Sequence, residues 1–164
     1  MRRSRRELEA VDLLPFRRAI AAGLPALMTA HVVYPALDRR PATMSTKICR
    51  DLLRKKLGFE GLLFSDDLEM NAVAGRSTPG RSAVAALRAG CDMLLVCQSL
   101  DAARKAMLGV EEAITRGTLS AADVATSLAR IQAYRRRLRR RPRPTRLGWP
   151  AHTRLARRLA AAKV

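Results

Sequence analysis

Three short apolar segments, each followed by a segment with helical periodicity, constrain the fold of this chain more than any other feature. They lie at residues 26–33, 61–65 and 92–97. Apolar runs of this length, bounded by Gly, Pro or polar residues, are typical of strands buried on both faces of a parallel sheet. Because the strands alternate with helical segments, the sequence predicts an α/β fold with helices packed on the sheet.

The number of strands limits how complete this fold is. A closed (β/α)8 barrel needs eight strands and about 250 residues, so a chain of 164 residues with three strands predicts a partial barrel. Pro15 interrupts the first expected helix, and Ser45 is predicted to cap the second. The expected helices occupy residues 7–22, 46–57, 81–89, 99–115 and 120–139.

Polar side chains follow two of the predicted strands. His31 lies near the end of the first, and Asp66 and Asp67 follow the second. Functional groups of parallel α/β folds gather where strands end and loops begin, and a carboxylate held there suits a nucleophile or a group that stabilises positive charge. These residues alone leave a second interpretation open, in which the acidic strand end is a helix cap or a loop ion pair.

Three segments, in order along the chain, resemble family 3 glycoside hydrolases. Residues 52–70 read LLRKKLGFEGLLFSDDLEM and resemble the segment that carries the family's nucleophile. Asp67, Leu68 and Met70 are typical of its β-N-acetylhexosaminidase branch. MTAHVVYPALD at residues 28–38 and ALRAGCDMLLVC at residues 86–97 are similar to that branch's preceding strand and its last barrel strand.

The resemblance implies retaining hydrolysis of a terminal β-linked N-acetylglucosamine, often from cell-wall fragments during recycling. Asp66 directly follows the Ser of the matching pattern and is therefore the expected nucleophile, with Asp67 as the alternative. His31 is expected at the neighbouring strand end, where it either lines the sugar site or serves as a hydrogen-bonded structural residue. No metal or organic cofactor is implied.

The general acid of this chemistry is missing from the sequence. In the family, a His–Asp pair on a Gly- and His-rich loop before the matching region supplies it, and His31 and His152 are the only histidines here, neither in such a loop. We therefore expect this chain to be inactive alone. A truncated or decayed gene, a start codon assigned too late, or pairing with a separately encoded N-terminal half would each account for it. Strand edges at residues 27–33 and 93–97 would lack neighbours, which favours self-association.

A basic tail follows the region of resemblance. The prediction is a barrel part at residues 1–134 and a flexible tail at residues 135–164. Residues 1–123 hold all 14 acidic residues and a net charge of +5, and residues 124–164 carry the remaining +13. The tail suggests a second function, a non-catalytic module that binds nucleic acid or an anionic surface. Only Tyr134 and Trp149 could stack on bases there, so we expect nucleic acid to bind only non-specifically.

The lack of a recognisable targeting signal and the pattern of cysteines predict a cytoplasmic protein. No apolar run approaches the roughly 18 residues of a membrane span, and the basic start of the chain has no apolar region behind it. Cys49, Cys91 and Cys97 lack metal-ligand spacing, and buried reduced thiols are expected for the two in apolar surroundings.

Overall fold

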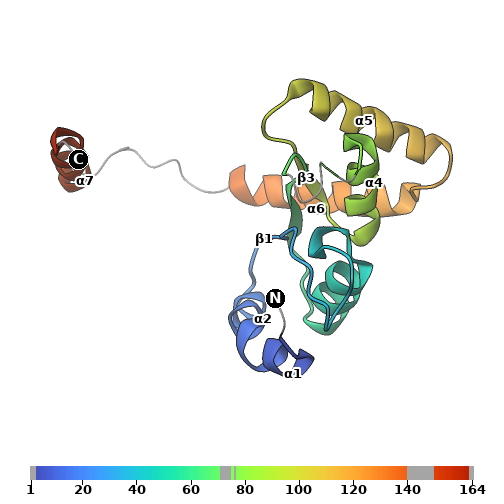
Figure 1. Cartoon of the computed structure of the whole chain (residues 1–164), viewed down its shortest axis with the longest axis horizontal. Coiled ribbons are helices and arrows are strands. Elements are labelled where there is room, and N and C mark those ends of the chain that lie inside the picture. The colour runs from blue at the N-terminus through green and yellow to red at the C-terminus, as the bar shows by residue number, and fades with distance from the viewer. Residues whose placement is uncertain (1–2, 71–74, 76, 140–149, 163–164) are drawn as a thin grey trace.

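A three-stranded parallel sheet forms the centre of the molecule. The computed structural model describes residues 3–70, 75, 77–139 and 150–162. In that part of the chain the strands are β1 (Ala26–Met28), β2 (Leu62–Asp67) and β3 (Met93–Leu95), in the order β1-β2-β3. Figure 1 labels β1 and β3 of this sheet, with α4, α5 and α6 near β3. The predicted α/β fold, three parallel strands with flanking helices in an open part of a barrel, is confirmed.

The strand register brings the carboxyl ends of all three strands to one edge. Met28 of β1 pairs with Phe64 of β2, which in turn pairs with Met93 of β3. After a shift in register, Asp67 pairs with Leu95. β2 is therefore the central strand, and its last residues lie between the ends of its two neighbours.

The outer strands are shorter and more exposed than the sequence predicts. β1 stops at Met28 and β3 covers only residues 93–95, whereas β2 extends to Asp67. Met28 is 56% exposed and Met93 is 39% exposed, so burial on both faces, expected for all three strands, was wrong for the outer two. The reason is that β1 and β3 each have a neighbouring strand on one side only among the described residues.

The expected helices are present, with local adjustments. The first forms as three consecutive pieces. The second piece ends where Leu13 N bonds Leu8 O at 2.8 Å, and Pro15 lies in the first turn of the third piece, where its missing N–H costs no helical hydrogen bond. Ser45 Oγ accepts the backbone N–H of Ile48 at 3.2 Å, which confirms the predicted cap. The helices are α1 (Arg5–Glu7), η1 (Leu8–Asp12), α2 (Leu14–Ala21), η2 (Ala42–Met44), η3 (Lys47–Lys56), α4 (Pro79–Ala89), α5 (Leu100–Thr115), α6 (Ala121–Arg139) and α7 (Pro150–Ala161).

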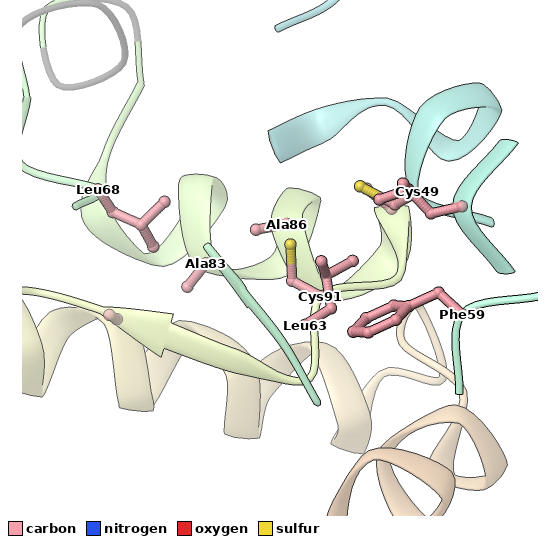
Figure 2. Close-up of a cluster of buried hydrophobic side chains, with 10 residues drawn as sticks. Cys49, Phe59, Leu63, Leu68, Ala83, Ala86 and Cys91 are labelled. Carbon is pink, nitrogen blue, oxygen red and sulfur yellow. The ribbon is translucent and has the colours of Figure 1, made fainter. Parts of the chain in front are cut away.

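Small residues let α4 pack closely on the sheet. Ala83 and Ala86 of α4 are 0% exposed and face Leu63 of β2 in the hydrophobic core (Figure 2). Cys49 and Cys91 belong to the same core and are buried free thiols, as predicted, whereas Cys97 is exposed. The full set of buried core residues is Cys49, Leu53, Phe59, Leu63, Leu68, Ala83, Ala86, Ala89, Cys91 and Ala106.

The predicted division of the chain at residue 134 falls inside α6 and stays a prediction. Part of the expected flexible tail, residues 140–149 and 163–164, lies outside the described residues. Within the described ranges, none of the helices is both long and apolar enough to span a membrane.

Candidate active site

Asp66 lies at the carboxyl end of the central strand. It is the last residue but one of β2 and is half-buried. Its Oδ1 accepts the backbone N–H of Asp67 at 2.9 Å, a local bond that fixes the carboxylate at the strand end. Among the residues that the structure describes, no cationic side chain forms an ion pair with Asp66. Within the described chain, the Asp66 side chain is thus held in place without a cationic partner.

The neighbouring carboxylate of Asp67 has a structural role. Its Oδ1 accepts two backbone N–H groups, from Glu69 at 3.1 Å and from Cys97 at 3.2 Å. The first bond closes the turn after β2, and the second joins that turn to the segment after β3. Asp66 and Asp67 are adjacent in sequence, but the Asp66 carboxylate bonds the next residue, whereas the Asp67 carboxylate joins two separate segments.

Glu69 makes a second connection between the same two segments. Its Oε2 accepts the backbone N–H groups of Gln98 at 2.7 Å and of Ser99 at 3.1 Å. Ser99 in turn caps α5, since its side chain accepts from Ala102 N. This role of Glu69 was not predicted from the sequence. No local pattern pointed to this role, because the two N–H groups that Glu69 accepts come from Gln98 and Ser99, far along the chain.

His31 reaches the same edge from the segment after β1. Its Nε2 lies 2.8 Å from the carbonyl oxygen of Asp67, and because a carbonyl oxygen only accepts, Nε2 donates this bond. Nδ1 is buried and has no hydrogen-bond partner among the described residues. The structure therefore brings His31 to the end of β2, next to the residues predicted from sequence. The bond from Nε2 to the backbone of β2 fits the structural role that the sequence left open.

Buried hydroxyl groups form the base of the site. Ser65 Oγ accepts Leu95 N at 2.9 Å and so joins β2 to β3. On the other side, the Thr29 and Thr43 hydroxyl groups are 2.9 Å apart, and Thr29 Oγ1 donates to Phe64 O at 3.3 Å. Ser65 and Thr43 are 0% exposed. These bonds fix the strand ends that carry the polar side chains.

The site is acidic. Partial desolvation, followed by the nearby carboxylates of Asp67 and Glu69, raises the pKa of the Cys97 thiol. In the described part of the chain, no group of three or more His, Cys, Asp or Glu side chains is arranged to hold a metal ion. Within the described residues, the arrangement offers the Asp66 carboxylate, which makes no ion pair there, at the end of the central strand, and the His31 imidazole bonded to the backbone of Asp67.

A carboxylate at the carboxyl end of a central parallel strand, in an open fragment of a (β/α) barrel, places the chain among barrel-type α/β proteins. The sequence model of the glycosyl hydrolase family 3 N-terminal domain matches residues 1–134. The chain belongs to this family. The resemblance predicted from the sequence is confirmed.

Curated relatives of the matching region are bacterial β-hexosaminidases. The chain is 45% identical over 105 residues to the β-hexosaminidase of Nitrosomonas eutropha, covering 64% of this chain and 30% of that protein. It is 50% identical over 100 residues to the β-hexosaminidase of Alkalilimnicola ehrlichii, covering 61% of this chain and 29% of that protein. The chain thus spans less than a third of the length of the curated relatives it matches.

Solved structures of β-N-acetylglucosaminidases share the fold of this chain. A glycoside hydrolase family 3 β-N-acetylglucosaminidase from Paenibacillus sp. superposes with a TM-score of 0.82 at 35% identity, covering 90% of this chain and 29% of that one. The β-N-acetylglucosaminidase from Thermotoga maritima superposes with a TM-score of 0.77 at 32% identity, covering 82% of this chain and 30% of that one. The chain is a fragment of a β-N-acetylhexosaminidase-like catalytic domain.

Proposed function

We propose that Asp66 is the nucleophile of a retaining β-N-acetylhexosaminidase whose remaining catalytic groups come from outside these 164 residues. The proposal rests on the contrast between two adjacent carboxylates. Among the described residues, Asp67 is bonded to two backbone N–H groups, whereas the Asp66 side chain makes only the local bond to Asp67 N. The identity to β-hexosaminidases over this region supports a terminal β-linked N-acetylglucosamine as the substrate. The setting that we propose is cell-wall fragment recycling.

The proposed reaction has two steps. A carboxylate oxygen of Asp66 bonds to the anomeric carbon, and the glycosidic oxygen leaves with a proton from a general acid. Water then cleaves the glycosyl ester, restores the Asp66 carboxylate and releases the sugar with its original anomeric configuration. His31, whose Nε2 donates to Asp67 O, would line the sugar site from the neighbouring strand end.

The general acid must be supplied by the part of the barrel that precedes the matched segment. At this edge of the sheet, the other carboxylates are Asp67 and Glu69, and both accept backbone N–H groups. Neither is free to deliver a proton to a leaving group. The chain alone is therefore expected not to cleave a chromogenic β-N-acetylglucosaminide, and the missing barrel segment is its expected partner.

A chimaera tests the assignment. The segment of the Nitrosomonas eutropha β-hexosaminidase that precedes the matched region would be joined to residues 1–134 of this chain. We expect the chimaera to cleave the chromogenic substrate and Asp66→Asn to lower kcat at least about a thousandfold. Asp51→Asn, at an exposed position of η3, is the matched control and should keep full activity. A chimaera that works equally well with Asp66→Asn would refute the assignment.

A further inference from the structure

The helix α7 (Pro150–Ala161) has an apolar face that nothing in the described chain covers. None of its residues is buried. Leu155 and Leu159 are 53% and 66% exposed, and because they are four residues apart they lie one above the other on the same face. Apart from these leucines, the apolar residues of the helix are alanines and one proline. The helix is therefore amphipathic, with a narrow apolar stripe.

The other face of α7 is strongly basic. Arg154, Arg157 and Arg158 are spaced three and four residues apart, so they share one side of the helix, away from the leucines. No acidic residue follows Asp123 anywhere in the sequence, so the segment itself offers no partner for these guanidinium groups. Residues 135–137 at the end of α6 add three more exposed arginines.

This combination favours one class of partner. Phosphates of nucleic acid would pair with the arginines but leave the leucines in water. A protein groove that binds a helix reads apolar anchors over two or more turns, and α7 has large anchors on only one turn. An anionic lipid surface satisfies both faces, because the leucines enter the acyl boundary while the arginines contact the headgroups.

We propose that α7 lies in the plane of anionic phospholipid bilayers and attaches the chain to them. The inference is independent of the proposed hydrolysis, since α7 lies beyond the family match at residues 1–134. Attachment by this helix is peripheral, with the helix axis parallel to the surface. Its strength depends on the buried leucines and on charge attraction, which salt screens.

Cosedimentation of the full 164-residue chain with lipid vesicles tests the proposal. We expect binding to vesicles of phosphatidylcholine with phosphatidylglycerol, and at least about tenfold weaker binding to phosphatidylcholine alone. The double change Leu155→Ser and Leu159→Ser should weaken binding to the anionic vesicles about tenfold. The matched control is Leu100→Ser with Leu108→Ser, two leucines of α5 that are 81% and 63% exposed, and it should bind like the original chain.

A second pair of variants separates insertion from charge attraction. Replacing Arg154, Arg157 and Arg158 by Gln should weaken vesicle binding about a hundredfold. Three exposed arginines outside α7, namely Arg81, Arg104 and Arg116, provide a control with the same loss of charge, and their replacement should weaken binding much less. Unchanged binding by the leucine variant would overturn the proposal and leave only electrostatic adhesion. If the chain does not bind the anionic vesicles but binds DNA in the same buffer, the membrane proposal is overturned in favour of a nucleic-acid partner.

Discussion

Arg54 and Asp92 form a buried ion pair that joins η3 to the start of β3. Arg54 Nη2 lies 2.5 Å from Asp92 Oδ2, and the two side chains are 13% and 0% exposed. The same Asp92 oxygen accepts Leu63 N at 2.9 Å, and the other oxygen accepts Arg130 Nη1 of α6 at 2.9 Å. Burial lowers the pKa of Arg54, and the charge of Asp92 opposes that effect. One carboxylate therefore connects a helix, the central strand and a second helix.

Asp92→Ala should lower the free energy of unfolding by about 3–5 kcal/mol, because Arg54 would remain nearly buried without its counter-charge. Urea unfolding followed by circular dichroism measures the loss. The matched control is Asp51→Asn, which removes the exposed pair to Lys55 on the surface of η3 and should cost less than about 0.5 kcal/mol. Equal losses in the two variants would show that the Arg54–Asp92 pair adds nothing beyond a surface contact.

The contact between α4 and α5 depends on two facing glycines. A Cβ atom built on Gly109 would lie 2.5 Å from Cα of Gly80, a distance that real side chains do not adopt. Gly109→Ala should therefore destabilise the fold by about 1–3 kcal/mol through overpacking, although Ala in an exposed helix would gain up to about 1 kcal/mol over Gly. Met107→Ala, at a position of α5 that is 71% exposed, is the control. A more stable Gly109→Ala variant would disprove the close crossing.

The sequence predicted the order of elements because each strand and helix carries its own periodicity. The sequence overestimated the length and the burial of β1 and β3. An apolar run shows that a strand is suited to burial, but it does not show that a neighbouring strand is present to bury it. Residues 29–33 belong to the predicted run at 26–33, yet β1 ends at Met28, and beyond it the backbone bond to β2 runs from Thr29 N to Phe64 O at 3.0 Å.

Part of the candidate site was predictable in the same way. Asp66 and His31 were expected at neighbouring strand ends. Both side chains bond the backbone of Asp67, because the carboxyl ends of parallel strands lie at one edge of the sheet. The roles of Glu69 and Asp92 were not predicted. Both act through bonds to backbone N–H groups about 30 residues away along the chain, and such long-range partners leave no local pattern in a sequence.

Thiol accessibility tests the core and the site together. Cys49 and Cys91 are buried and Cys97 is exposed, so a thiol reagent should modify one cysteine in the folded chain and all three in denaturant. The raised pKa of Cys97 means less reactive thiolate near pH 8, so its modification should be slower than that of a cysteine in the unfolded chain. Rapid modification of a second thiol under native conditions would contradict the packed core.

Stability should fall at acid pH partly through Asp123. Its hydrogen bond and ion pair with Arg50, at 2.9 Å, lower its pKa below the ordinary value of 3.8. A carboxyl with a lowered pKa stabilises the fold above its ordinary pKa, and this contribution is lost as the pH falls through the folded-state value. Both side chains are about a third or more exposed, so Asp123→Asn should cost less than about 1 kcal/mol near pH 7. Once the pH is low enough to protonate Asp123 in the folded chain, urea unfolding should show no difference from the original chain, and a difference that persists there would contradict the ionic origin.

The division of roles between Asp66 and Asp67 can be tested without any enzymatic activity. Asp67→Ala removes the acceptor of two backbone N–H groups, those of Glu69 and Cys97, and should lower the free energy of unfolding by about 1–3 kcal/mol. Removing that carboxylate also lowers the pKa of Cys97, so its thiol should be modified faster. Asp66→Ala loses only a bond to the next residue and should change stability by no more than about 0.5 kcal/mol. If Asp66→Ala were instead the more damaging change, Asp66 would be a structural residue, and Asp67, the alternative nucleophile, would take its place in the proposed reaction.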